Sequence, residues 1–357
     1  MDQVNTSSRV PAETVAALIA DAFKAIGLPP ADAAKCAELM LEADLTGADA
    51  HGVFRLPQYV KRLRAGGVNP KPDIRVEKTA AATATVDGDN GMGHLVMARA
   101  AETAIELARD AGVGWVGVHG SNHAGSAGVY AAMALPHGMV GIYGVVASAN
   151  HMPVWGGVES LLGTNPVAVA IPAGAEAPIV LDIATSVVSY GTVKSHRLQG
   201  RPMPEGWMVN TKDGTPLTDP ARSSEGVLLP IGGYKGSGLA LVLGLLAGPL
   251  NGAAFGRDVF DFNYNDTDVC NTGHFIVALD IKRFTPLDTF KSEMDRHLRD
   301  LRTSKPLPGQ GPVRLPGQER RARRTDRLTN GVPLPRELIA QLDTLAGELG
   351  VKPLGAR

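Results

Sequence analysis

The stretch TAAATATVDGDNGMGHLVMARAAETAIELARDAGVGWVGV, residues 79–118, determines the expected fold. A strand-like run covers Thr79–Val86, and the turn DGDNGMG follows it. A helical pattern then covers His94–Ala111 before a second strand-like run at Val113–Val118. Strands that alternate with helices in this way are typical of an α/β layer. We therefore predict that this part of the chain forms a sheet covered by helices.

The same alternation continues downstream. We predict a helix of small residues over Ala124–Leu135 and a third strand over Met139–Val146. Gly238–Ala247 is apolar on all sides, so we expect it to form a buried helix. Further strands are expected at Pro166–Ile171, Ile179–Ile183 and His274–Leu279.

Both ends of the chain have helical patterns. Near the N-terminus, Ala12–Ile26 and Ala31–Leu45 repeat apolar residues at intervals of three and four. Near the C-terminus, Thr285–Leu301 is amphipathic, and Pro335–Leu349 is expected to be the closing helix. Residues 302–318 are rich in proline, which predicts an extended arm that wraps around a neighbouring surface.

Length and composition limit the classes of protein. At 357 residues the chain is longer than one hydrophobic core usually covers, so we expect two lobes. The formal charge of −1 gives no long-range field that would attract nucleic acid or an anionic membrane. Cys36 and Cys270 form no CxxC pattern and no secretory signal is visible, which favours a reduced, cytoplasmic setting. The apolar run Gly238–Leu250 is shorter than the roughly 20 residues that a membrane span needs.

One short segment is strongly basic. ERRARRTDR, Glu319–Arg327, contains five arginines. No aromatic residue that would stack on nucleic-acid bases lies among them. We therefore favour a solvated or subunit-contacting C-terminal arm over an RNA-binding patch.

The segment GADAHGVFRLP, Gly47–Pro57, is the first candidate functional site. His51 precedes Arg55 by four positions, and residues four apart share one face of a helix. Histidine exchanges a proton near neutral pH, and arginine binds a carboxylate through two hydrogen bonds. The pair suits a small acid substrate. An amphipathic helix with two polar residues on its wet face explains the spacing equally well.

Two glycine clusters are candidates for nucleotide binding. GVGWVG, Gly112–Gly117, matches G-x-G-x-x-G, but it follows a helix and becomes a strand, whereas the dinucleotide fingerprint follows a strand and begins a helix. We therefore expect no Rossmann site there. GGYKGSG, Gly232–Gly238, precedes a predicted helix, so its backbone N–H groups and Lys235 could bind a phosphate. A flexible helix entry required for tight packing is the alternative.

Three further features could carry chemistry. His119 and His123 have the spacing of a metal-binding pair, with His151 further on, but glycine and serine between the first two make a helix improbable. A single histidine at the end of a strand, acting as proton donor or substrate ligand, fits better. Asp182 ends a predicted strand, where it could orient a histidine or cap the helix that follows it. No serine nucleophile elbow is present, which disfavours a serine hydrolase.

The motifs taken together resemble one family. EADLTGADAHGVFRLPQY, DGDNGMGH, SNHAGSAGVY, PVWGG, LLGTNP, LDIATS, GGYKGSGLA and NTGHF occur in this order. The set resembles the malate/L-lactate dehydrogenases that are unrelated to the Rossmann lactate dehydrogenases. That family also includes ureidoglycolate and sulfolactate dehydrogenases, diketogulonate reductase and cyclic ketimine reductases. The match extends from about Ala12 to the last predicted helix.

The resemblance implies a nicotinamide-dependent oxidoreductase, using NAD or NADP, that is usually a homodimer. It implies an α/β, non-Rossmann NAD(P)-binding domain with a central mixed sheet, formed by residues 76–285. A discontinuous helical domain for substrate binding and dimerisation would comprise residues 1–75 and 286–357. No metal ion is expected at the site.

The resemblance also assigns roles to individual residues. The catalytic group would contain His51, His123 and Asp182, and Arg55 and Thr164 would bind the substrate. The cofactor would be bound by segments that match Ser148, Asn165, Pro166, Asp182, Ile183, Gly232, Lys235 and Gly236.

Two positions depart from the family pattern. Many members have a serine directly before the first histidine, whereas this chain has Ala50. A late Pro-Gly-Glu of the family reads Pro316-Gly317-Gln318 here, so the acid is lost. Substrate choice therefore cannot be transferred from any one member.

The hypothesis that follows is hydride transfer between nicotinamide and C2 of a small 2-hydroxy or 2-oxo acid. Arg55 would bind the carboxylate, and one of His51 and His123 would exchange the proton. Reduction of a cyclic ketimine is an alternative, because such a substrate has the same carboxylate and C2. A metal-dependent lyase or hydrolase that uses the histidines and Asp182 is a second alternative. A non-catalytic ligand-binding relative is a third, suggested by Ala50.

Overall fold

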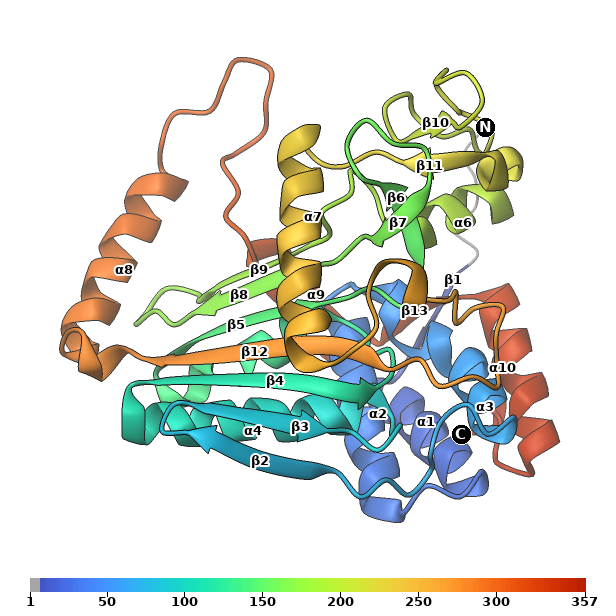
Figure 1. Ribbon diagram of the computed structural model, residues 1–357, viewed down its shortest axis with the longest axis horizontal. Coiled ribbons are helices and arrows are strands. Elements are labelled where there is room, and N and C mark those ends of the chain that lie inside the picture. The colour runs from blue at the N-terminus through green and yellow to red at the C-terminus, as the bar shows by residue number, and fades with distance from the viewer. Residues whose placement is uncertain (1–6) are drawn as a thin grey trace.

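The computed structural model describes residues 7–357, and a seven-stranded mixed sheet lies at its centre (Figure 1). Only β3 and β4 pair in parallel, while the other neighbours in the order β2-β3-β4-β12-β5-β8-β9 are antiparallel. This mixed sheet confirms the predicted α/β class and differs from the parallel Rossmann sheet. Its strands are β2 (Arg75–Ala80), β3 (Thr83–Asp87), β4 (Val113–Ser121), β12 (Thr272–Asp280), β5 (Met139–Val145), β8 (Val167–Ile171) and β9 (Ile179–Ile183).

The remaining strands form three small antiparallel pairs in the described part of the chain. They are β1 (Ser7–Val10) with β13 (Val332–Pro335), β6 (Asn150–Pro153) with β7 (Ser160–Gly163), and β10 (Met208–Asn210) with β11 (Gly226–Leu228). The α-helices are α1 (Ala12–Ala25), α2 (Pro30–Leu45), α3 (Leu56–Arg64), α4 (Gly93–Ala111), α5 (Ala127–Ala132), α6 (Tyr190–Leu198), α7 (Tyr234–Ala247), α8 (Leu287–Arg302), α9 (Gln318–Asn330) and α10 (Arg336–Leu349).

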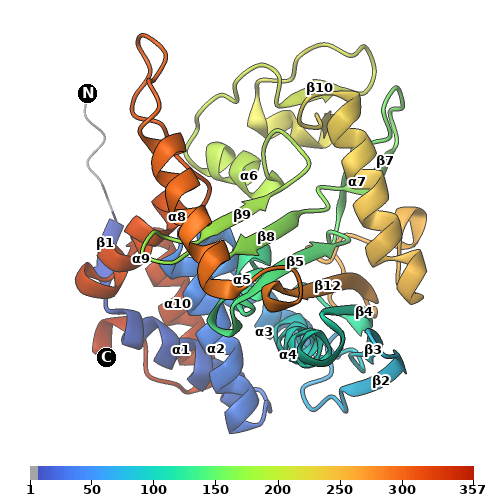
Figure 2. The same ribbon diagram turned by 90° about the vertical axis from the view of Figure 1, so that its left-hand side faces the viewer.

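Helices cover both faces of the main sheet. Figure 2 shows α4 and α5 on one face and α7 on the other. Alternate residues of β12 supply the two cores, because successive strand side chains point to opposite faces. Ile276 and Ala278 join the core beneath α4 and α5, whereas Phe275 and Val277 join the core beneath α7.

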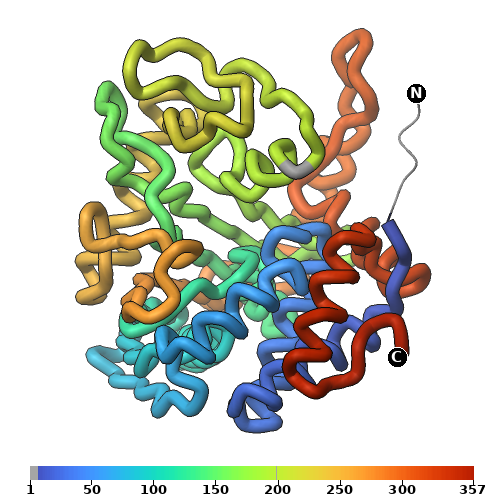
Figure 3. The backbone as a smooth tube through the Cα atoms, turned by 90° about the vertical axis from the view of Figure 1, so that its right-hand side faces the viewer, coloured from blue at the N-terminus to red at the C-terminus, as the bar shows by residue number. Residues whose placement is uncertain are grey.

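The two ends of the chain form one helical layer, visible as adjacent blue and red tubes in Figure 3. Side chains from α1, α2, α3 and α10 share one hydrophobic core, which includes Phe23, Met40, Leu56 and Leu342. β1 and β13 join the ends through an antiparallel pair. These helices form the helical unit expected from both chain ends, whereas α8 contributes no residue to this core, and the boundaries 1–75 and 286–357 stay a prediction.

Two predicted elements differ in extent. The expected strand Thr79–Val86 is a hairpin, because a turn after Ala80 separates the exposed edge strand β2 from β3. The expected helix Ala124–Leu135 is shorter, since Gly125 has a left-handed backbone with φ of 75° that a right-handed helix cannot include. Within residues 7–357, no helix combines the length and apolarity needed to cross a bilayer.

The prediction that Gly238–Ala247 is fully buried is wrong. The helix is an outer layer on the sheet: its fully buried residues are small, among them Ala240, Gly244 and Ala247. Leu241, Leu243 and Leu246 are partly buried against the neighbouring cores. Leu239, Val242 and Leu245 on the outer face are 48%, 54% and 43% exposed. We call these three residues the α7 stripe.

The C-terminal region also departs from expectation. Residues 303–312 project from the body and are exposed, and the segment returns to the sheet at Pro316, whose carbonyl accepts from the Val180 N–H at 3.4 Å (Figure 1). The basic segment forms the helix α9, which packs against α2 while most of its residues stay exposed, and a subunit contact there stays a prediction. Its Arg320, Arg324 and Arg327 form ion pairs with the chain's own Asp182, Glu42 and Asp49 respectively.

Candidate active site

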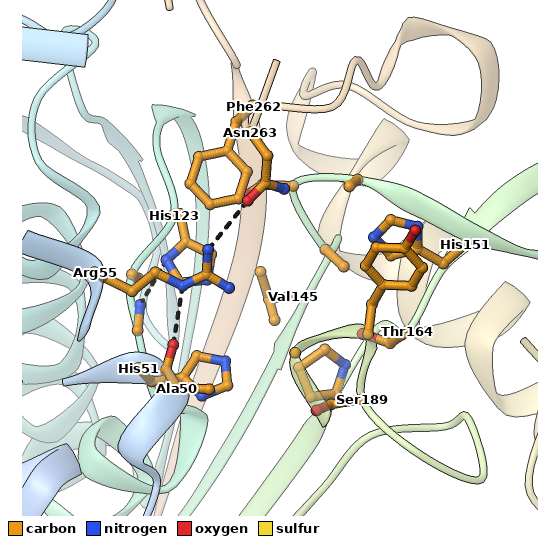
Figure 4. Close-up of a pocket in the computed structure, with 18 of the residues that line it drawn as sticks. Ala50, His51, Arg55, His123, Val145, His151, Thr164, Ser189, Phe262 and Asn263 are labelled. Atoms are coloured by element: carbon orange, nitrogen blue, oxygen red, sulfur yellow. Dashed lines mark hydrogen bonds between the residues drawn. The ribbon is translucent and has the colours of Figure 1, made fainter. Parts of the chain in front are cut away.

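A cavity of about 110 Å³ brings together residues from distant parts of the chain. Figure 4 shows His51, Arg55 and His123 on one side of it, and His151, Thr164 and Ser189 on the other. We call the first three residues the histidine wall. The α6 wall consists of His151, Tyr190 and Lys194, and Asn263 bridges the two walls.

The backbone before α3 places His51 and Arg55, but not on one helical face as the spacing predicts. Two short 3-10 turns, Asp49–His51 and Val53–Arg55, are separated by Gly52, whose φ of −95° and ψ of −137° are not helical. Buried Asp44 fixes this break by accepting a 2.8 Å hydrogen bond from the Val53 N–H. A Cβ at Gly52 would lie 2.0 Å from Asp44 Oδ1, so the close approach requires glycine. Asp44 therefore sets the local path of the chain.

The Arg55 guanidinium is fixed on two sides and open on a third. Nε donates to the Ala50 carbonyl over 2.9 Å, and Nη1 donates to Asn263 Oδ1 over 3.1 Å. The ring of Phe262 lies 5.5 Å from the guanidinium carbon. Nη2 has no hydrogen-bond partner among residues 7–357, and it faces the cavity in Figure 4. The side chain is positioned to receive an anionic oxygen.

His123 is held in one orientation from behind. Its Nδ1 lies 2.7 Å from the Tyr59 hydroxyl oxygen and 3.3 Å from the Gly125 backbone nitrogen. Burial raises the pKa of Tyr59, so the phenol stays protonated and donates to Nδ1, as does the Gly125 N–H. The neutral ring therefore carries its proton on Nε2. Its ring also stacks on Phe262 at 5.0 Å between centroids.

Both histidines of the wall are electrically neutral in this environment. Burial, followed by the charge of Arg55, lowers the pKa of His123 well below its usual value. The same two causes lower the pKa of His51 to about 4, although Asp182 acts in the opposite direction. The two rings lie 5.7 Å apart and almost parallel, at 6°. A neutral imidazole can accept the proton of a substrate hydroxyl or donate its own N–H hydrogen bond.

Asp182 does not hydrogen-bond to a histidine in the described chain. Its Oδ2 accepts from Ser126 Oγ at 2.9 Å, from the Gly128 N–H at 2.9 Å and from Arg320 Nη1 at 2.7 Å. The carboxylate thus caps the first turn of α5 and anchors α9. The prediction that Asp182 caps the helix after it is wrong, because Asp182 accepts from the Gly128 N–H of the earlier helix α5, whereas Ser189 caps α6. A catalytic role of Asp182 stays a prediction.

The residues predicted to bind the cofactor divide into two groups. Ser148, Thr164 and Pro166 line the cavity. Asn165 is buried beside it, accepting from the Ala147 N–H at 3.0 Å and donating to the Ala240 carbonyl at 2.8 Å. The remaining predicted residues do not line the cavity; they are Asp182, Ile183, Gly232, Lys235 and Gly236. Their binding roles remain predictions.

The other two motifs have structural explanations. GVGWVG runs from the end of α4 into β4, and a Cβ at Gly114 would lie 2.1 Å from the Ala104 carbonyl oxygen, so this glycine allows helix and strand to pack closely. His151 lines the cavity, stacked on Tyr190 at 4.0 Å, whereas His119 does not line it. Among residues 7–357, no three His, Cys, Asp or Glu side chains form a group that could bind a metal ion.

Sequence patterns did not reveal Lys194, Tyr190, Phe262 and Asn263, which also line the cavity. Lys194 had no sequence signal. Phe262 and Asn263 lie in VFDFNYNDTD, residues 259–268, where Asp and Asn indicate turns but no known ligand pattern.

Comparisons with known proteins show the family to which the chain belongs. The family model described as malate/L-lactate dehydrogenase matches residues 10–343. A malate dehydrogenase of Pyrococcus abyssi is 36% identical over 97% of this chain and 96% of its own length. An L-sulfolactate dehydrogenase of Methanocaldococcus jannaschii is 37% identical over 94% and 95% of the two chains. The solved structure of a malate dehydrogenase from Pyrococcus horikoshii superposes with a TM-score of 0.90 at 33% identity, covering 99% of each chain.

Proposed function

The chain belongs to the malate/L-lactate dehydrogenase family, and from that premise we propose how its cavity acts. The protein is an NAD(P)-dependent oxidoreductase that transfers a hydride between nicotinamide and C2 of a small 2-hydroxy or 2-oxo acid. Relatives include dehydrogenases named for NAD(+) and for NADP(+). The observation that carries the assignment of residues is the open Nη2 of Arg55 beside two neutral histidines.

Arg55 binds the substrate carboxylate in this proposal. Two of its three nitrogens are already held by Ala50 and Asn263, so the guanidinium is pre-oriented and little freedom is lost on binding. The third nitrogen faces the cavity. A carboxylate placed there brings the adjacent C2 towards the imidazoles of the histidine wall.

His123 is the better candidate for proton transfer. Tyr59 and Gly125 donate to its Nδ1, so the Nε2–H is left to hydrogen-bond the oxygen at C2. During reduction Nε2 gives its proton to that oxygen while Nδ1 takes the proton of the Tyr59 hydroxyl, and during oxidation both protons move back. His51 has no comparable hydrogen bonds in the described chain. We assign His51 to shaping the site, and the more distant Asp182 contributes a negative charge that acts on it.

The cavity fits a nicotinamide ring. Val145, Val146 and Pro166 provide an apolar surface, and the hydroxyls of Ser148 and Thr164 stand beside it without a hydrogen-bond partner among residues 7–357. These hydroxyls suit the carboxamide of a nicotinamide. When bound, the cofactor supplies or accepts the hydride, while the protein holds the acid and moves the proton. Lys235 and Gly232 at the start of α7 are proposed to bind its phosphates.

We further propose a homodimer formed through the α7 stripe. Leu239, Val242 and Leu245 form an uncharged apolar surface next to Gly238, which has open space where a Cβ would stand. A second helix of the same kind can approach closely at such a surface, and a second copy supplies one. We also propose two domains, one formed by residues 1–75 and 286–357 and the other by residues 76–285. We propose in addition that the protein is cytoplasmic, because Cys36 and Cys270 are free thiols.

The test follows the near-UV absorbance of NADH and NADPH with a panel of 2-oxo acids and cyclic imino acids. Turnover of 2-oxo acids supports the proposal, turnover of imino acids alone points to ketimine reduction, and no turnover with any acid contradicts it. Arg55→Ala should raise the KM for the acid about 100-fold or more while the KM for the cofactor changes little. Arg55→Lys is the matched variant that keeps the charge. Equal effects on both KM values would exclude Arg55 as the carboxylate ligand.

A further inference from the structure

A second positive charge faces the cavity from the α6 wall. Lys194 lies in α6, and Ser189 caps the first turn of that helix by accepting from the Thr192 N–H at 3.2 Å. The Lys194 ammonium nitrogen lies 5.6 Å from the centroid of the Tyr190 ring and 6.0 Å from that of Tyr264. Aromatic faces attract an ammonium group, so these rings hold the lysine beside the cavity.

Lys194 and Arg55 share one neutral acceptor. Lys194 Nζ donates to Asn263 Oδ1 over 3.3 Å, and Arg55 Nη1 donates to the same oxygen over 3.1 Å. Asp261 orients this amide by accepting from the Asn263 backbone N–H at 2.9 Å and from Nδ2 at 2.5 Å. The two cationic nitrogens can therefore be no farther apart than the sum of their distances to the shared oxygen.

Neither cation forms an ion pair with an Asp or Glu of residues 7–357. The carboxylate of Asp261 is occupied by Asn263, although its charge still raises the pKa of Lys194. Burial and the neighbouring Arg55 act more strongly and lower that pKa. Two like charges held together in a partly buried cavity repel each other, and an anion that contacts both removes the repulsion.

We propose that Lys194 binds a second anionic group of the substrate, so that the site selects 2-hydroxy and 2-oxo acids with a carboxylate or sulfonate on C3. This inference rests on the proposed function, because Arg55 must hold the first carboxylate for Lys194 to meet a group on C3. Only C2 and C3 separate the two anionic groups in such an acid. That short spacing matches two cations that share one oxygen, whereas a monoanionic acid leaves Lys194 without an anionic partner.

A phosphate of the cofactor is the other anion that could reach Lys194. The segment expected to bind phosphates, Gly232–Lys235, does not line this cavity, which favours the substrate. The two sources differ in a measurable way, since a phosphate contact would change the KM for the cofactor.

The kinetic test compares Lys194→Met with the wild type on oxaloacetate and 3-sulfopyruvate, and on the monoanions pyruvate and 2-oxobutyrate. We expect kcat/KM of the preferred dianion to fall about 50-fold, that of the monoanions less than about threefold, and the cofactor KM to stay unchanged. Lys194→Arg should restore most of the preference. Lys212→Met, at an exposed lysine of the same lobe, is the control and should match the wild type. An equal loss on both kinds of acid, or a change confined to the cofactor KM, overturns the proposal.

A binding measurement decides the role of Lys194 even if no acid is turned over. Succinate and butyrate lack an oxygen at C2 and cannot react, and calorimetry with NAD present measures their affinity. Lys194→Met should weaken succinate about 50-fold and leave butyrate unchanged. Equal binding of succinate by both proteins would overturn the inference. Absence of turnover with intact succinate selectivity would instead contradict only the proposed function.

Discussion

The two walls of the cavity are built in different ways. The histidine wall is held by its own neighbours: Tyr59 and Gly125 hold His123, and the Ala50 carbonyl holds Arg55. The α6 wall depends on ring stacking and on one bridging amide, Asn263. Reactive groups thus occupy the side with short, buried hydrogen bonds, where geometry is fixed. The side that contacts the rest of the substrate can change without disturbing them.

The largest difference between the walls should appear in turnover. We expect His123→Ala to lower kcat about 1,000-fold and to remove one limb of the pH–rate profile, because the group that exchanges the proton is lost. His151→Ala on the α6 wall is the matched control and should change kcat less than about fivefold. If His51→Ala loses that limb while His123→Ala keeps it, the proton-transfer role belongs to His51. Full activity of both variants would remove proton transfer from this wall.

Gly52→Ala tests how rigidly the histidine wall is held. The new Cβ would lie 2.0 Å from Oδ1 of the buried Asp44 carboxyl group that fixes the Val53 backbone, so Asp44 or the turn must move. We expect the free energy of unfolding to fall by about 3 kcal/mol and the KM for the acid to rise, because His51 and Arg55 flank this residue. Denaturant unfolding and kinetics measure both effects. Gly347→Ala is the control and should be neutral or stabilising, because nothing lies within 4 Å of the new Cβ. If Gly52→Ala keeps the stability and the KM of the wild type, the histidine wall is not rigid.

His94 behind the histidine wall should make the fold sensitive to acid. Its ring packs edge-on against Tyr59 at 5.3 Å, and neither ring nitrogen has a partner in the described chain. Burial, followed by the charge of His51, lowers the pKa of His94 to about 3, whereas an unfolded histidine has a pKa of about 6.5. As the pH falls, the unfolded state therefore binds the proton first. The contribution of neutral His94 to the free energy of unfolding is fully present above about pH 6.5 and is lost as the pH falls towards 3.

The measurement is chemical unfolding at pH 8 and pH 5. Between these values the wild type should lose about 2 kcal/mol more stability than His94→Leu, because the variant has no proton to bind at this position. His137→Leu, at an exposed histidine, should follow the wild type. An identical loss in His94→Leu and the wild type would show that His94 is not buried in its neutral form.

Sequence patterns predicted the sheet and the helical chain ends because these depend on local periodicity. β4, β5, β8, β9 and β12 lie close to their expected ranges, since apolar strand residues and turn glycines determine them locally. The α7 stripe shows where that reasoning fails. Apolarity on all sides does not reveal whether a helix is covered by its own chain or by another.

The site was predicted in part, and for partly wrong reasons. His51 and Arg55 do meet at the cavity, but through two 3-10 turns rather than one helical face. Asp182 pairs with Arg320, an arginine 138 positions away, which no local pattern could indicate. Lys194 and Asn263 were missed because their proximity to Arg55 arises only when α6 and the 259–268 loop fold over the cavity.

A crystal structure of the protein with NAD(P) and oxamate, an unreactive analogue of a 2-oxo acid, would show directly whether Arg55 and His123 bind the substrate. We expect the oxamate carboxylate to contact Arg55 Nη2 and the neighbouring oxygen to lie within hydrogen-bond distance of His123 Nε2. A carboxylate bound on the α6 wall, away from Arg55 and His123, would contradict this expectation.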